Sequence, residues 1–228
     1  MTDSLGLNWP RKGDKAFAFK GRPRDPSHVT AFVLPFPEMY ACGYKDAGDK
    51  VIEAAEHDTR NPDALFFPVA FLYRHFLELT LKDLVRLGRS MGAIDISYHS
   101  QSHRCRKCGH KWKVEEDILF QHDLNKLWKE ARKLIMDVLP NGNGEVAEAL
   151  EATEKTIQEF HILDKSGQET RYATSKSGKR SLTVSGTGGH LRHQRVSLQN
   201  LKRTMDKVDR YLDANYAAIQ ACDYDSPI

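Results

Sequence analysis

Residues 61–89 read NPDALFFPVAFLYRHFLELTLKDLVRLGR. Apolar side chains recur in this stretch at steps of three and four residues, and they cover most of the circumference of a helix. A helix with one solvent-facing side shows a narrower apolar stripe, so the pattern predicts a helix over 62–89 that other helices surround. We therefore expect an all-α fold, a four- to five-helix bundle built around this segment.

A line of charged residues interrupts the apolar surface of this helix. Arg74, Glu78 and Lys82 follow one another at intervals of four residues, a spacing that stacks side chains on one face. Buried charges lose their hydration and are costly unless they are paired. The three side chains can form a structural ladder of ion pairs, or Arg74 and the adjacent His75 can act on an anionic substrate while Glu78 orients one of them. The spacing fits both explanations.

Four further helices are predicted around this one. Apolar and aromatic residues recur with helical period over 38–57, over 146–163 and from Leu198 to about Ala221. The remaining helix starts near His122-Asp123-Leu124, carries an apolar stripe without a miss, and is stopped by Pro140. Asp123 is a suitable capping residue for that start, whereas His122 could reach the charged face of the 62–89 helix if the two helices are neighbours.

The composition allows one core and no strong conclusion about partners. The chain has 228 residues, of which 40% are apolar and 29% charged, and its formal net charge is +3. A charge this small does not by itself indicate a nucleic-acid partner. We predict a flexible basic arm over 1–29, a helical bundle over 30–222 and a short tail over 223–228.

The same sequence predicts a cytoplasmic protein with no membrane partner. Its first ten residues lack the pattern of a signal peptide, and the longest apolar run, over 64–73, is too short to cross a bilayer. The best-marked enzyme signatures, such as the Walker sequence and the zinc-protease motif, are absent from the sequence.

A cysteine pair marks a candidate metal site. Cys105 and Cys108 form a C-x-x-C motif, which places both thiolates on one turn, and His103 and His99 are candidates for the other two ligands. We predict a structural zinc in a knuckle inserted over 97–114, because four side-chain ligands leave no position for a water. A pair of surface thiols in a loop is the alternative.

A basic, glycine- and serine-rich loop is predicted over 165–193, with a short β-hairpin-like strand at 181–185. Such a loop could follow a phosphate backbone with salt-dependent affinity, although a solvated loop fits equally well. The candidate RNA-binding cations are Lys82, Arg171, Lys179, Arg180 and Arg192.

Two of these segments together resemble the HEPN superfamily of small helical bundles, found in prokaryotic toxin–antitoxin, abortive-infection and other defence proteins. The residues that carry the resemblance are Tyr73-Arg74-His75, Glu78-Leu79 and Leu81-Lys82, followed by His122-Asp123-Leu124 and Leu127. The match as a whole covers about a third of the chain.

The resemblance implies a bundle of four or five helices that is usually dimeric and that, in active members, cuts RNA without metal. Those members carry an Arg and a His four to six residues apart on a late helix, whereas here Arg104 and His110 have that spacing inside the cysteine segment. The candidate catalytic residues are therefore Arg74, His75, Glu78 and His122, which offer a cation, a base and an orienting carboxylate.

The sequence thus leads to two hypotheses about function. The first is a HEPN-like protein of a prokaryotic defence or toxin–antitoxin type system that binds RNA, with or without cleaving it, as a homodimer or with an antitoxin or other defence partner. The second is a non-catalytic helical interaction or dimerisation module with a structural zinc.

Overall fold

A computed structural model describes residues 37–57, 62–90, 118–138, 144–172, 178 and 195–221. Contacts divide the chain into Met1–Pro35 and Phe36–Ile228, and every described residue belongs to the second unit. Several predicted features lie outside the described residues: the arm over 1–29, the zinc knuckle over 97–114, the strand at 181–185 and the tail over 223–228.

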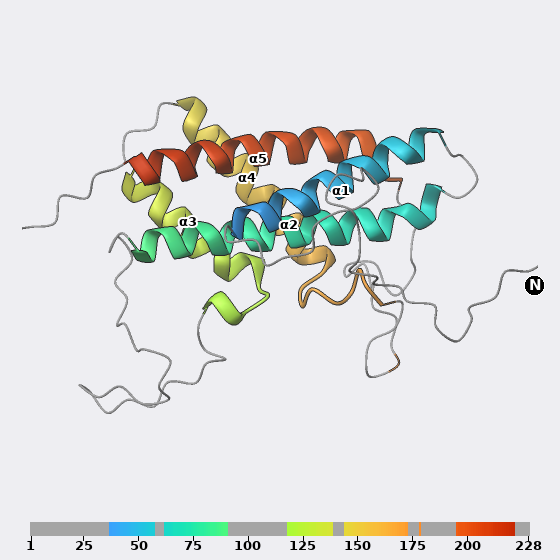
Figure 1. Cartoon of the computed structure of the whole chain (residues 1–228), viewed down its shortest axis with the longest axis horizontal. Coiled ribbons are helices and arrows are strands. Elements are labelled where there is room, and N and C mark those ends of the chain that lie inside the picture. Colours follow the sequence, from blue (N-terminus) through green and yellow to red (C-terminus); the bar gives the residue numbers. More distant parts are fainter. Residues whose placement is uncertain are drawn as a thin grey trace, which may run out of the picture. The chain divides into compact units, whose positions relative to one another are not determined.

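The described part of the chain is all-α, as the sequence predicts (Figure 1). A short 3₁₀ helix, η2 (Ile118–Phe120), precedes the third helix. The five α-helices are α1 (Pro37–His57), α2 (Pro62–Ser90), α3 (Leu124–Val138), α4 (Gly144–Leu163) and α5 (Leu198–Ala221). These bounds lie within a few residues of the predicted ones, because the apolar period shows the extent of each helix and Pro or Gly residues mark some of the ends, such as Pro62 at the start of α2.

The helix α2 is the centre of the bundle. It packs against α1, α3, α4 and α5, and α1 and α5 run alongside it (Figure 1). Its fully enclosed apolar side chains are Val69, Tyr73, Phe76, Leu77, Leu81, Leu84 and Val85. They point to several sides of the helix, which explains why the sequence shows no single apolar stripe.

The helix α3 behaves as a two-sided helix. One face buries Leu124, Leu127, Trp128, Ala131, Leu134 and Ile135. Its start is capped as predicted, because an Asp123 carboxylate oxygen accepts the backbone N–H of Lys126 at 3.1 Å. This cap fixes where α3 begins, directly after His122.

Among the described residues, one helix is long and apolar enough to span a membrane by length and composition alone, and it is α2 over Asp63–Ser90. The central helix of a bundle passes the same test. The packing of four other helices around α2 accounts for its apolar composition without a bilayer.

A network of charges, separate from the charged line of α2, joins α1 to α5. The Lys45 ammonium lies 3.0 Å from Asp49 and 2.7 Å from Asp206. The Tyr73 hydroxyl of α2 donates to the other Asp49 oxygen at 2.5 Å, and the Tyr73 ring packs directly over Gly48. The close approach of α1 and α2 here depends on a residue without a Cβ.

Two glycines of α1 give a matched test of this packing. Replacing Gly43 by Ala should raise the free energy of unfolding by about 1 kcal/mol, because alanine favours the helix and nothing described lies within 4 Å of the new Cβ. Replacing Gly48 by Ala should lower it by about 1–3 kcal/mol, because its Cβ would lie 2.9 Å from the Tyr73 ring, which is 0% exposed. Urea denaturation of both variants measures the difference, and equal stabilisation by the two alanines would contradict the packing.

Candidate functional site

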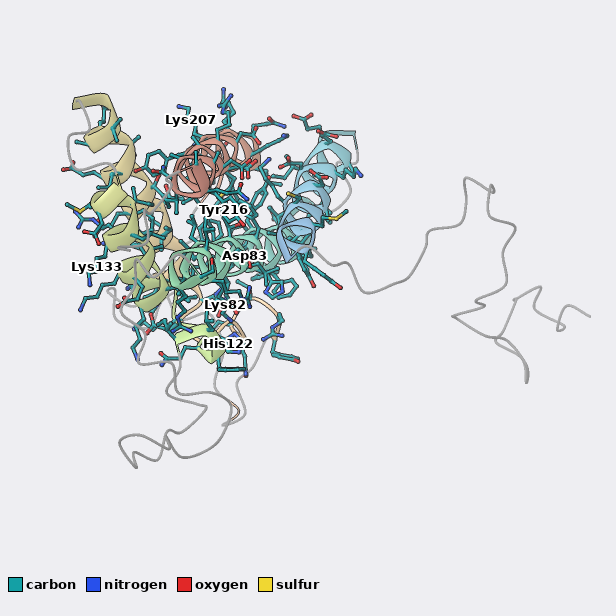
Figure 2. All side chains as sticks on the ribbon, turned by 60° about the vertical axis from the view of Figure 1, so that its left-hand side comes forward. Lys82, Asp83, His122, Lys133, Lys207 and Tyr216 are labelled. Atoms are coloured by element: carbon teal, nitrogen blue, oxygen red, sulfur yellow. The ribbon has the colours of Figure 1, made fainter. Side chains whose placement is uncertain are left out.

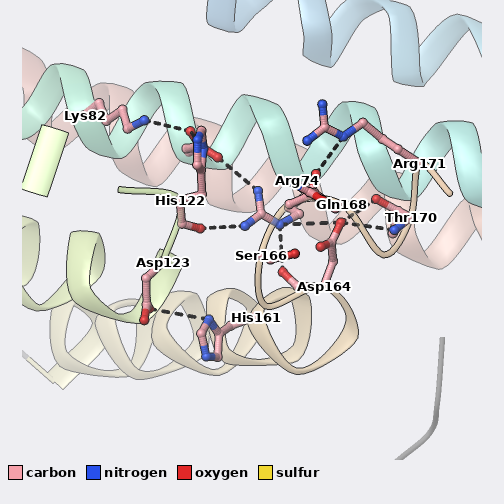
Figure 3. A network of polar contacts seen from close by, with 12 residues as sticks. Arg74, Lys82, His122, Asp123, His161, Asp164, Ser166, Gln168, Thr170 and Arg171 are labelled. Atoms are coloured by element: carbon pink, nitrogen blue, oxygen red, sulfur yellow. Dashed lines mark hydrogen bonds and ion pairs between the residues drawn. The ribbon is translucent and has the colours of Figure 1, made fainter. Parts of the chain in front are cut away.

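The charged line of α2 is a buried ladder of ion pairs, so the structural explanation of the spacing is confirmed (Figure 3). One Glu78 oxygen lies 3.0 Å from Arg74 Nη1, and the other lies 2.7 Å from Lys82 Nζ. Arg74 and Glu78 are each 2% exposed and Lys82 is 7% exposed. The single carboxylate therefore serves two cations inside the bundle.

Arg74 joins α2 to two segments that are distant in sequence. Its Nε donates to the backbone carbonyl of Asp164 at 2.8 Å, and its Nη2 donates to that of His122 at 2.6 Å. With Nη1 on Glu78, all three guanidinium nitrogens have protein acceptors. The planar fork of arginine suits acceptors that lie in three directions.

The turn that follows α4 is built around the Asp164 carboxylate. Backbone N–H groups of Glu169 and Thr170 donate to it at 3.1 and 3.2 Å, and the Thr170 hydroxyl donates at 2.5 Å. Burial alone would raise the pKa of Asp164, but its contacts with Glu169 and Thr170 and the charge of Arg74 lower that pKa to about 2. The carboxylate is therefore ionised at neutral pH.

Gly167 lets this turn approach Arg74. Its φ is +76°, a left-handed conformation that favours glycine. A Cβ at this position would lie 2.9 Å from Arg74 Nη1, so the close approach excludes a side chain for a second reason. The turn over 164–172 is the first part of the predicted basic loop, and the structure describes it as packed on α2.

His122 reaches the ladder from the segment before α3, as the sequence allowed (Figures 2 and 3). Its Nδ1 lies 2.8 Å from Glu78, while 61% of its side chain is exposed. Burial would raise the pKa of Glu78, but Lys82 and His122 lower it, so the carboxylate is ionised and accepts the Nδ1 proton. In the neutral imidazole, Nε2 is then the unprotonated nitrogen.

His75 does not belong to this network. Its ring stacks on Phe71 at a centroid distance of 5.8 Å and an angle of 11°, and it meets the edge of Tyr44 at 4.3 Å. Burial among these rings lowers the pKa of His75, so its ring is neutral at neutral pH. Of the four candidate catalytic residues, the structure thus brings together Arg74, Glu78 and His122.

The candidate RNA-binding cations occupy different environments. Lys82 is bound to Glu78 inside the bundle, whereas Arg171 is exposed and lies over the rings of Phe71 and Tyr172. The other three, Lys179, Arg180 and Arg192, lie outside the described residues.

The predicted metal ligands also lie outside the described residues: Cys105, Cys108, His103 and His99. Within the described ranges, no group of three or more His, Cys, Asp or Glu side chains could hold a metal ion.

A groove of about 650 Å³ lies between α3 and α4. Trp128 and Met136 supply its apolar lining, and charges of both signs surround them. Two of these charged residues form an ion pair, because Arg132 Nε lies 3.1 Å from a Glu154 carboxylate oxygen. The lining residues include none of the candidate catalytic side chains.

The sequence drew attention to Tyr172 as an aromatic residue within the basic segment, but it did not give Asp164, Gly167 or Phe71 a role in the site. The run Asp164-Lys165-Ser166-Gly167 has the composition of a turn, and that signal predicts a loop without indicating what the loop packs against. Phe71 belongs to an apolar pattern in which every position has the same appearance. The roles of these residues depend on contacts between segments about a hundred residues apart.

Comparisons with known proteins leave the family open: no family model, curated protein or solved structure matches the chain. The functional argument therefore depends on the residues and geometry described above.

The ladder predicts a large cost for removing its shared carboxylate. Replacing Glu78 by Gln keeps the shape but leaves the buried Lys82 without its counter-ion and Arg74 with Asp164 alone, so the free energy of unfolding should fall by about 3–5 kcal/mol. The control is Glu151→Gln on the exposed surface of α4, which should change it by less than about 0.5 kcal/mol. Chemical denaturation compares the two variants, and equal small effects would mean that the ladder adds little to stability.

Proposed function

We propose that this protein is a HEPN-like helical bundle of the prokaryotic defence or toxin–antitoxin type that works by binding RNA and not by cutting it. The observation that carries the proposal is the complete internal use of Arg74, whose three nitrogens have protein acceptors. Arginine is the residue type best suited to bind a phosphate, but Arg74 instead holds the bundle together.

Cleavage of a phosphodiester needs a cation that is free to meet the phosphate and a base within reach of the attacking hydroxyl. In the ladder, Glu78 pairs with Arg74 and Lys82 through its two oxygens, and the Asp164 carboxylate, 3.8 Å from Arg74 Nε, supplies the second negative charge. A substrate would have to displace buried ion pairs to reach these groups, at a cost of several kcal/mol.

RNA is the proposed ligand because of the segment that leaves α4. Arg171 is exposed at the end of the turn over 164–172, beside the aromatic ring of Tyr172. The sequence that continues from it to residue 193 is rich in Lys and Arg and contains neither Asp nor Glu. Basic side chains with aromatic neighbours favour a single-stranded nucleic acid.

The proposal includes the setting in which such a protein works. The proposed homodimer is what the resemblance to HEPN bundles implies, and the proposed cytoplasmic location is the expectation from the sequence. An antitoxin or another defence-system protein is the proposed partner. If the bundle does not bind RNA, the alternative is the non-catalytic interaction or dimerisation module that the sequence also allows.

One observation supports cleavage as a second candidate function. His122 projects an exposed imidazole while its Nδ1 lies on the buried, ionised Glu78. This is how a carboxylate orients a histidine that acts as a general base through Nε2. A ribonuclease built on this pair would need its phosphate-binding cation from elsewhere in the chain.

The RNA proposal predicts salt-sensitive retardation of single-stranded RNA on a native gel. Binding should be clear at low salt and weaken steadily as salt rises, because each phosphate contact releases counter-ions. The RNA should remain intact during the incubation, and His122→Ala should bind it as the unaltered protein does. Unretarded RNA at low salt would exclude binding. Cleavage of the RNA by the unaltered protein that is lost in His122→Ala would favour the second candidate.

We also propose a structural zinc over 97–114, held by Cys105 and Cys108 with His103 and His99, and a short hairpin at 181–185. The support is the C-x-x-C spacing, together with the need of a short polar insertion for a stabilising link.

Metal analysis of the purified protein tests the zinc proposal. We expect about one zinc per chain, lost in a Cys105→Ser, Cys108→Ser variant and retained in a Cys42→Ser control, since Cys42 is an exposed free cysteine of α1. Purified protein without bound zinc would end this proposal.

A further inference from the structure

We propose that Phe71, Arg171 and Tyr172 form a stacking site for an unpaired nucleobase. The inference rests on the proposed RNA binding and goes beyond it, because it identifies where a base is held and which form of RNA is preferred. Phe71 comes from α2, whereas Arg171 and Tyr172 end the turn after α4.

The three side chains form a mixed aromatic and cationic cluster. The Arg171 guanidinium carbon lies 5.4 Å from the centre of the Phe71 ring and 5.9 Å from that of Tyr172, both within the range of a cation–π contact. Tyr172 is 58% exposed, Arg171 is exposed, and Phe71 is partly exposed. A flat ligand can therefore reach both a ring face and a planar cation.

The turn that packs on the ladder holds Arg171 in place (Figure 3). Arg171 Nε donates to the Gly167 carbonyl at 2.7 Å, and Gly167 lies directly against the Arg74 guanidinium. The guanidinium of Arg171 is thus fixed through the turn to the centre of α2. A side chain that is ordered before binding loses less conformational entropy when the ligand arrives.

Phe71 is held from behind by two further rings. It stacks on His75, and His75 meets the edge of Tyr44 on α1, so the three rings form a continuous column. Because burial keeps His75 neutral, the column adds no second charge beside Arg171. The ring of Phe71 is therefore kept in a defined orientation.

A nucleotide of single-stranded RNA fits this chemistry in two ways. Its base offers a π face to the rings and the guanidinium, and its phosphate offers an acceptor to the arginine. The Arg171 side chain is exposed, so its charge can meet a phosphate. The bases of a duplex are stacked inside the helix and hide these faces, so the site should favour single strands.

The test compares ring and charge variants of the full chain by titration with a fluorescent single-stranded RNA. Tyr172→Ala should weaken binding about tenfold, whereas Tyr172→Phe should bind as the unaltered protein does, because only the ring stacks. Arg171→Lys should also lose affinity, since a lysine keeps the charge but not the planar face. Phe120→Ala is the matched control, because Phe120 is an aromatic residue that is 62% exposed on η2, outside this cluster.

A duplex of the same sequence should bind more weakly than the single strand, and the preference should shrink in Tyr172→Ala. The inference falls if Tyr172→Ala and Phe120→Ala bind alike while the unaltered protein still binds RNA, or if the duplex binds as tightly as the single strand. If the unaltered protein binds no RNA at low salt, the proposed function falls together with the inference. Circular dichroism of each variant establishes that it is folded.

Discussion

The structure depends on the burial of one guanidinium group. Arg74 is almost completely removed from water at the centre of the bundle, and a charge in that position is tolerated only if every donor has an acceptor. Its acceptors come from Glu78 on the same helix and from backbone carbonyls 48 and 90 residues further along the chain. The approach to α3 and the turn after α4 must therefore lie against α2 for the central helix to be stable.

This requirement separates the chemistry of the molecule into an internal and an external part. The internal charges are balanced, since the carboxylates of Glu78 and Asp164 face Arg74 and Lys82, and contacts with Lys82 and His122 keep Glu78 ionised. The groups left at the surface are attached to that network at its edges: His122 through Glu78, and Arg171 through Gly167. Structural residues thus determine the orientation of the side chains that can meet a ligand, which is why the proposed function is assigned to the edges and not to the centre.

The sequence predicted the helices because their information is local. The apolar period, the Asp123 cap and Pro140 each act within a few residues, and the observed bounds follow them closely. The ion-pair ladder was also predictable as one of two explanations, because its spacing of four residues is a property of one helix. The sequence could not show whether the Arg74 side chain is buried. That depends on the backbone carbonyl of Asp164, which lies 90 residues further along the chain and accepts a hydrogen bond from Arg74. For the same reason His75, adjacent to Arg74 in sequence, was grouped with it although its ring packs against Phe71 and Tyr44.

The geometry around Arg74 also limits which residues this position can accept. Lysine has the same charge, but its single ammonium sits at the end of a flexible stem and cannot serve three acceptors that lie around a planar fork. A lysine there would leave at least one buried carbonyl without a donor, at a cost of about 1–3 kcal/mol for each. Among chains that keep this turn and the approach to α3, an arginine at position 74 should therefore always occur with a glycine at position 167, since the glycine makes room for the guanidinium.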